Sequence, residues 1–448
     1  MSKDTHETMT QGPIPRVLLS LALPTMASML MTSIYQIADT FYVASLGTQA
    51  TAAVGITFAL TSLIQAVGFT LGMGGGSLIS LSLGKQEKER ASQIASTSFY
   101  LALLLGIGIA LALGARDPIL TLLGADDQIL PYARDYSFFL FLSAPLFTGS
   151  LCLSHLLRSE GHTGYVMRAI VSSGLLSLVL SPLLMRFLGI QGISLATLLS
   201  QLLCLCLLLY PFFRKKTVLS LRLFPFRVSS LRLLPSILFN GLPSLLRQGL
   251  AAVSAALLSR AATAYGAGAV AGMSIAGKIF MIVLTLMLGY GQGLQPLLGY
   301  NYAQGLTRRV RGAALFCLWT GTAGLVLLAA VCFLQAPFLI SLFSTEEEVQ
   351  AIALLALRAG ALTMPLLGIC TIVNLGFQAI KRPVIATFLA SARQGLFFIP
   401  LIFLLPPALG LLGVQIAQAV ADAATFVLSV PFLLYFLRKA VDKKNGKV

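Results

Sequence analysis

Twelve apolar stretches, each longer than about 20 residues, run through this chain of 448 residues. A stretch of that length is what a helix needs to cross the hydrocarbon core of a bilayer. Lipid offers the backbone no hydrogen-bond partners, so the stretches must be helices, and the short alternating strands of a membrane barrel are not seen. The sequence therefore predicts an all-α polytopic membrane protein. The twelve predicted spans are residues 15–45, 52–83, 92–113, 131–157, 165–187, 191–213, 235–261, 268–300, 311–335, 351–379, 384–405 and 411–437.

The amino-acid composition also indicates a protein whose surface is in contact with lipid. The chain is 57% hydrophobic and only 10% charged, whereas a soluble domain is about one quarter charged. Its formal net charge of +16 would be compatible with nucleic-acid binding, but the basic residues lie in short clusters between apolar runs. That distribution is typical of topology signals, so we expect a lipid bilayer and no nucleic acid as partner.

Lys and Arg predict the orientation of the spans. Both termini and every second loop carry most of the 31 basic residues, including Arg158 and Arg168 between the fourth and fifth spans. The positive-inside rule then predicts a multi-pass protein of the cell membrane with both termini in the cytoplasm. The opposite loops hold few basic residues and two acidic runs: Arg116, Arg134, Arg186, Arg260, Asp126–Asp127 and Glu346–Glu348.

The two halves of the chain repeat each other. Leu23-Pro24 recurs as Leu242-Pro243 and Gly47 as Gly266, at a constant shift of 219 residues. Because each half has six spans, both halves enter the membrane from the same side, which predicts two parallel six-helix repeats forming two lobes. We expect an N-terminal lobe at 1–213, a basic cytoplasmic linker at 214–234 and a C-terminal lobe at 235–448. Such repeats typically place a substrate site between halves that rock against each other.

Several segments resemble one transporter family. They are Ile37-Ala38-Asp39-Thr40-Phe41-Tyr42-Val43 with Leu46-Gly47, Gly241-Leu242-Pro243-Ser244-Leu245-Leu246-Arg247-Gln248, Gly289-Tyr290-Gly291-Gln292-Gly293-Leu294-Gln295-Pro296 with Gly299-Tyr300-Asn301-Tyr302, and Ser391-Ala392-Arg393-Gln394-Gly395-Leu396. In this order on a duplicated chain, they are similar to the multidrug and toxic compound extrusion (MATE) transporters. The resemblance implies a V-shaped pair of lobes and efflux driven by a proton or sodium gradient. It also implies cargo that is often cationic and aromatic.

The fifth span departs from the pattern of that family. In the branch that this chain most resembles, an Asn and an Asp lie one turn apart and face the Asp of the first span. The matching positions here are Ser177 and Ser181, before Pro182. The expected ion site thus lacks one carboxylate, which argues against simple sodium coordination and against a relay between two acids.

Two acids lie well inside predicted spans, Asp39 and Asp422. A charge within a bilayer costs at least a few kcal/mol, so such residues are functional candidates. The first six spans hold no basic residue away from their ends, so Asp39 is expected to be protonated part of the time or to bind a cation. The alternative is a structural carboxyl group satisfied by hydroxyl groups of the first and fifth spans. Asp422 could instead pair with Arg393, and a functional and a structural role stay equally open for it.

Other polar residues within spans could line a cavity or serve as hydrogen-bonding contacts between helices. Basic residues of the second half, Arg247, Lys278 and Arg393, would also suit an anionic or zwitterionic cargo. Six cysteines in apolar runs and three scattered histidines show no metal-site or redox spacing. We expect no cofactor and no metal. The cavity candidates are Gln36, Gln65, Gln248, Gln292, Asn374 and Gln378.

These residues predict a secondary active transporter that exports small, cationic amphiphilic compounds by antiport with protons or sodium, and we expect a monomer. Ion coupling and substrate binding are assigned to Asp39, Gln36, Ser177 and Ser181, and the cavity of the C-terminal lobe to Arg247, Asn374, Gln378, Arg393 and Asp422. The alternative within transport is a flippase or exporter of lipid-linked or polyanionic cargo. An intramembrane enzyme would need clustered His, Ser-Lys or paired Asp residues, which the spans lack. Prolines within spans, such as Pro24, are expected to bend their helices, and these bends and the repeat fit alternation between two states better than a channel.

Overall fold

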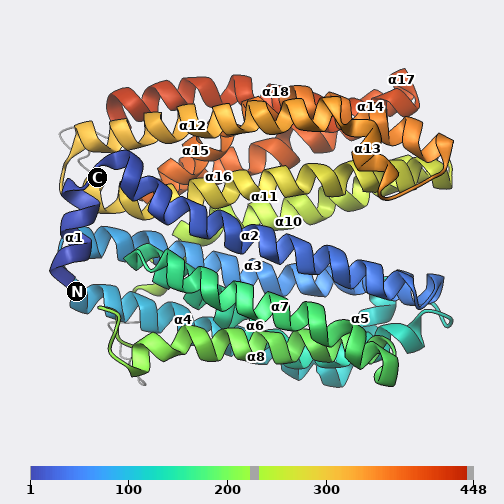
Figure 1. The fold of residues 1–448 in the computed structure, drawn as a ribbon, viewed down its shortest axis with the longest axis horizontal. Coiled ribbons are helices and arrows are strands. Elements are labelled where there is room, and N and C mark those ends of the chain that lie inside the picture. The colour runs from blue at the N-terminus through green and yellow to red at the C-terminus, as the bar shows by residue number, and fades with distance from the viewer. Residues whose placement is uncertain (1, 222–231, 441–448) are drawn as a thin grey trace.

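The computed structural model describes residues 2–221 and 232–440. Within these ranges it contains twelve helical segments that are long and apolar enough to cross a membrane, and each overlaps one predicted span. The predicted all-α membrane fold is therefore confirmed, and Figure 1 shows the helices running side by side along the long axis. The helices are α1 (Ser2–Gln11), α2 (Ile14–Ala44), α3 (Thr48–Gly84), α4 (Lys88–Leu111), α5 (Arg116–Leu122), α6 (Leu130–Glu160), α7 (Thr163–Leu188), α8 (Ile190–Phe213), α10 (Leu234–Thr263), α11 (Ala267–Ala303), α12 (Thr307–Leu334), α13 (Ala336–Ser341), α14 (Glu347–Thr363), α15 (Leu367–Ala379), α16 (Pro383–Ser391), α17 (Ile399–Leu409) and α18 (Leu411–Tyr435).

Helices α2–α8 form one lobe and α10–α18 form the other, seen in Figure 1 as a blue-to-green half and a yellow-to-red half. Matching turns of the two lobes share an unusual backbone. Gly47 before α3 and Gly266 before α11 have φ of 109° and 99°, and Gly189 before α8 and Gly410 before α18 have φ of 59° and 61°. Positive φ is sterically cheap only for glycine, which explains these residues at the turns. The parallel six-helix repeat is thus present in the backbone itself.

The lobes touch along the end of the molecule that carries the N-terminus. A methyl group added at Gly74 of α3 would lie 2.3 Å from the carbonyl oxygen of Ile237 of α10. One added at Gly293 of α11 would lie 2.4 Å from Cα of Ala22 of α2. The glycine run near Gly74, which resembles a phosphate loop only superficially, therefore allows helices of opposite lobes to pack backbone against backbone.

Three spans are interrupted. A 3₁₀ turn at 112–115 separates α4 from α5, and a second one containing Pro365 separates α14 from α15. A π-helical turn, Ala392–Phe398, separates α16 from α17. Such turns are frequent at functional sites, and this one carries Arg393. Pro24, in contrast, lies within the continuous helix α2.

The predicted linker at 214–234 is only partly described, because residues 222–231 lie outside the described ranges. Its first residues are attached to the N-terminal lobe. The buried carboxylate of Glu160 accepts hydrogen bonds from the Thr217 hydroxyl and from the Val218 amide, the latter at 2.5 Å. The Ser220 amide donates to the Ser92 hydroxyl at 3.1 Å. The lobe boundaries at 213 and 235 remain a prediction.

Candidate functional site

A cavity of about 500 Å³ lies between the lobes and is lined by side chains of both. Its size falls in the range of sites for drug-sized molecules, which are mostly apolar with a few polar groups. Apolar and aromatic side chains make up much of the wall, and charged groups lie at separate places on it. The apolar part includes Met29, Phe58, Phe69, Leu140, Phe147, Met281, Leu284 and Leu288, and the charged groups are Asp39, Arg158, Arg247 and Arg393.

Asp39 lies on the cavity wall in the half of α2 that is distant from the N-terminus. The Ser181 hydroxyl of α7 donates a hydrogen bond to Oδ1 of Asp39 at 2.8 Å. Tyr35 and Tyr136 line the same cavity as Asp39. Among the described residues, no Lys or Arg pairs with Asp39, so its partners are neutral.

Ser177 lies one turn before Ser181 and has a different environment. Its side chain is buried, and its hydroxyl finds no hydrogen-bond partner in the described part of the chain. Neither serine is on the cavity wall. Of the two hydroxyl groups placed beside Asp39 from the sequence, only that of Ser181 therefore contacts the carboxylate.

The structure places the predicted amide residues in two groups. Gln36, Gln65, Gln248, Gln292 and Asn374 line the cavity. Gln378 does not: its side chain is fully buried, and its amide donates to the Asn240 carbonyl at 2.9 Å and to the Ser244 hydroxyl at 3.2 Å. Assigning Gln378 to the cavity was thus wrong, because the side chain lies on the face of α15 that packs against α10.

Arg393 and Asp422 form an ion pair. Nε of Arg393 donates to Oδ1 of Asp422 at 2.7 Å, and its Nη2 lies 3.3 Å from Oδ2. The Gln418 amide donates to the same carboxylate at 2.8 Å, and the guanidinium also lies 5.5 Å from the centre of the Phe280 ring. Arg393 reaches the cavity wall, whereas Asp422 is fully buried behind it. Lys278, which the sequence also suggested for an anionic cargo, is half-buried away from the wall.

Sequence reasoning missed the environment of Arg158. It counted this residue among the cytoplasmic loop charges, but α6 continues to Glu160, and the Arg158 side chain is only 3% exposed and reaches the cavity. The sequence signal for a longer helix was Gly161, because glycine commonly follows the last residue of a helix. In the structure, Gly161 has a φ of +104° and ends α6. The loop assignment failed because α6 extends beyond the predicted span and brings the Arg158 guanidinium to Gln292 of α11, in the other lobe.

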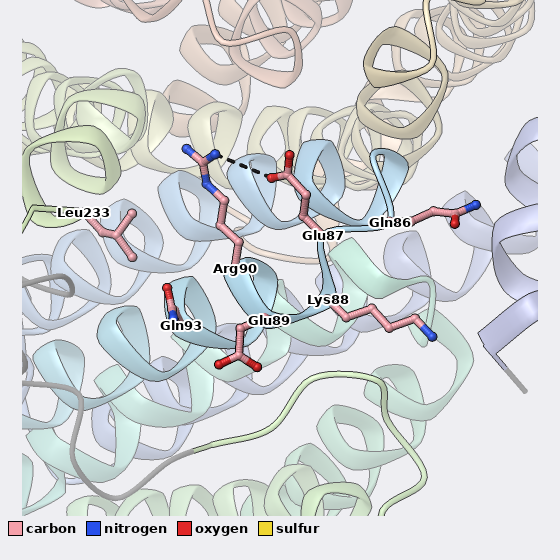
Figure 2. A pocket seen from close by; sticks show the side chains of 7 residues that line it. All are labelled: Gln86, Glu87, Lys88, Glu89, Arg90, Gln93 and Leu233. Atoms are coloured by element: carbon pink, nitrogen blue, oxygen red, sulfur yellow. Dashed lines mark hydrogen bonds and ion pairs between the residues drawn. The ribbon is translucent and has the colours of Figure 1, made fainter.

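A second depression lies at the α3–α4 turn and differs from the cavity in kind. Figure 2 shows its side chains, with Glu87 and Arg90 joined by an ion pair of 3.5 Å. The side chains of both partners are exposed to solvent, and so are the neighbouring Lys88 and Glu89. An exposed pair of this kind contributes little binding energy, so we place no substrate here.

Comparison with known proteins assigns the chain to one family. The MatE family model matches residues 24–183 and, separately, residues 243–404. The chain belongs to the MatE family. The resemblance drawn from the sequence segments is therefore confirmed, and this MATE transporter is a multi-pass protein of the cell membrane. The two matched regions lie in different lobes, as the repeat requires.

The MATE relatives differ in the cargo that their names give. The multidrug export protein MepA of Staphylococcus haemolyticus is 26% identical over 445 residues, 97% of each chain. The FAD transporter of Shewanella oneidensis is 28% identical over 419 residues, 89% of each chain. A solved outward-facing structure of a multidrug resistance MATE transporter superposes with a TM-score of 0.91 at 27% identity, covering 98% of each chain. The family thus includes proteins named for quite different compounds.

Proposed function

We propose that this MATE transporter exports small amphiphilic compounds by antiport, and that Asp39 is the group that binds the coupling ion. The observation that carries the proposal is a carboxylate on the cavity wall whose only hydrogen-bond partner among the described residues is a neutral serine. A structural acid is normally paired when buried. A carboxylate left with a neutral partner is free to exchange a cation.

The chemistry of the Asp39 site favours a proton over sodium. The carboxylate and the Ser181 hydroxyl supply few oxygen atoms for a metal cation, and Ser177 contributes none at contact distance. A hydroxyl group, by comparison, can donate to the ionised carboxylate or accept from the protonated one. Protonation at Asp39 therefore needs only a rotation of the Ser181 hydroxyl.

The conformation of the lobes supports a direction for the cycle. The lobes are joined at the end carrying the N-terminus, while Asp39 lies toward the opposite end of the cavity. With both termini in the cytoplasm, as the basic loops predict, this is the state in which cargo leaves to the outside. Neutralising Asp39 would favour bending of α2 near Pro24 and cargo release, since coupling requires ion and cargo to prefer different states.

The apolar and aromatic wall suits amphiphilic cargo, and a cationic group would lie beside Asp39. The name of the MepA relative, a multidrug export protein, supports a broad range of such compounds.

The decisive experiment measures dye efflux from cells that lack their own pumps, with proton and sodium gradients collapsed separately. We expect efflux to stop when the proton gradient is removed and in Asp39→Asn, whose fold is checked by its unfolding midpoint. Asp127→Asn, at an exposed position, removes the same charge and should transport normally. Unchanged efflux by Asp39→Asn, or efflux insensitive to both gradients, would show that the proposal is wrong.

A further inference from the structure

Arg158 is a buried cation that lacks a charged partner. Its Nη1 lies 3.5 Å from Oε1 of Gln292, and its Nε and Nη2 have no hydrogen-bond partner in the described part of the chain. Burying an unpaired charge is costly, so such groups usually find a counter-ion. The guanidinium reaches the cavity, where a bound molecule could supply one.

Arg247 approaches the same region from the opposite lobe. Its guanidinium donates only to neutral acceptors, namely Oδ1 of Asn374 at 3.3 Å, the Met73 sulfur at 3.3 Å and the Ser244 hydroxyl at 3.5 Å. Both Arg247 and Arg158 line the cavity. Within the described residues, neither guanidinium forms an ion pair.

We propose that Arg158 and Arg247 form an anion-binding site at the closed end of the cavity, which takes a carboxylate or phosphate group of the cargo. The planar guanidinium matches both groups with two parallel hydrogen bonds. The apolar wall, including Phe69 and Phe147, then holds an aromatic or aliphatic body. This inference rests on the proposed function only in taking the cavity as the place where cargo binds.

The placement of the two arginines on different lobes gives the site a role in the transport cycle. Arg158 lies on α6 of one lobe and Arg247 on α10 of the other, so the two lobes each bring one positive charge to the same cavity. Their repulsion in a poorly solvated site opposes closure, and an anion between them removes that repulsion. Binding of an anionic cargo from the cytoplasm therefore favours closure of the lobes at this end, which is the outward-facing state.

The test is equilibrium binding of four fluorescent probes to the purified full-length protein in detergent. The probes share one aromatic core and carry a carboxylate, a phosphate monoester, a neutral methyl ester or a quaternary ammonium group. We expect both anions to bind at least about tenfold more tightly than the ester, because a charge-assisted hydrogen bond contributes that much. The tighter of the two anions identifies the preferred headgroup.

Substitutions of the two arginines test whether they cause the tighter binding of the anionic probes. Arg158→Gln and Arg247→Gln should each weaken binding of the anions by about tenfold or more and leave ester binding unchanged. Arg168→Gln, at an exposed position of α7, should change neither. Unfolding midpoints and Arg158→Lys, which keeps the charge, separate loss of the site from loss of the fold.

Equal affinity for the carboxylate and the ester would overturn the proposal. So would Gln variants that bind the anions normally. Because binding is measured without a gradient, Asp39→Asn should still bind the anions. Anion binding together with gradient-independent efflux would therefore contradict the antiport proposal and leave the anion site standing.

Discussion

Each lobe has one aspartate well inside a span, and the two aspartates have opposite surroundings. Asp39 of the N-terminal lobe reaches the cavity and is bonded to the neutral Ser181 at 2.8 Å. Asp422 of the C-terminal lobe is fully buried and is held by Arg393 at 2.7 Å and by Gln418 at 2.8 Å. In the duplicated fold, these carboxylates are not at equivalent positions, since the repeat aligns Asp39 with Leu258.

The difference teaches that an acid within a span is not by itself a transport residue. A carboxylate neutralised by a fixed guanidinium has little to gain from a proton, whereas one with a neutral partner can gain or lose a cation as its environment changes. The partner, rather than the depth in the membrane, separates the two. Asp422 thus has the surroundings of a structural group, and Asp39 those of an exchanging one.

The largest expected effect is on the stability of the C-terminal lobe. Asp422→Asn leaves Arg393 as a buried charge without its counter-ion, which should lower the free energy of unfolding by about 3–5 kcal/mol. Asp39→Asn removes no ion pair and should leave the unfolding midpoint nearly unchanged. Thermal unfolding of the two purified variants in the same detergent compares them directly. Equal loss of stability would break the contrast between the two acids.

Next in size is the effect of the Ser181 hydroxyl on transport. Ser181→Ala removes a hydrogen bond to a charged group, a contribution of about 1.5–3 kcal/mol, so the efflux rate at a fixed gradient should change by about tenfold or more. Ser177→Ala is the matched control, because the Ser177 hydroxyl has no partner in the described part of the chain. Similar efflux rates in the two variants would show that Ser181 does not act on Asp39.

The Arg393–Asp422 pair can also be replaced as a whole. Arg393→Met with Asp422→Leu leaves no unpaired charge, so the free energy of unfolding should return to within about 1–2 kcal/mol of the native value. Comparing the double variant with Asp422→Asn by thermal unfolding measures how much the unpaired Arg393 charge lowers the free energy of unfolding. If the double variant were as unstable as the single one, packing around the pair would be the cause instead.

The smallest effect concerns a third carboxylate, Glu160, which holds the linker and lies 3.3 Å from His162. The hydrogen bond to Glu160 raises the pKa of His162 above its ordinary value, and burial only partly opposes this. The pair therefore stabilises the fold most below about pH 6.5, and this contribution is lost as pH rises through the higher folded-state pKa.

We expect the pH-dependent part to stay below about 1 kcal/mol, as for other partly exposed pairs. Unfolding midpoints measured at pH values below and above this transition should differ in the native protein, with the lower pH more stable. In His162→Ala, this part of the pH dependence should disappear. A native midpoint that rose with pH across the same range would contradict the assignment.

The spans and the repeat could be predicted from the sequence because they depend on hydropathy and on residues that recur along the chain. Asp39 could be found for the same reason, as an acid within an apolar run. Arg158 and Gln378 could not be placed, because their positions depend on neighbouring helices. Arg158 contacts Gln292 of α11 in the other lobe, and the Gln378 amide donates to the Asn240 carbonyl of α10. The π-helical turn that presents Arg393 also has no local sequence signal that we recognised.

The backbone contact between Gly74 and Gly241 has a consequence for repeated cycling. Interdigitated side chains would have to change rotamers each time the lobes separated, and each such rearrangement would slow reversal. At these glycines no side chains interdigitate, so the two helical backbones can separate and meet again there without rotamer changes. The glycines thus allow the contact between the lobes to open and re-form in every transport cycle. For a transporter, rapid reversal of this contact matters more than its strength.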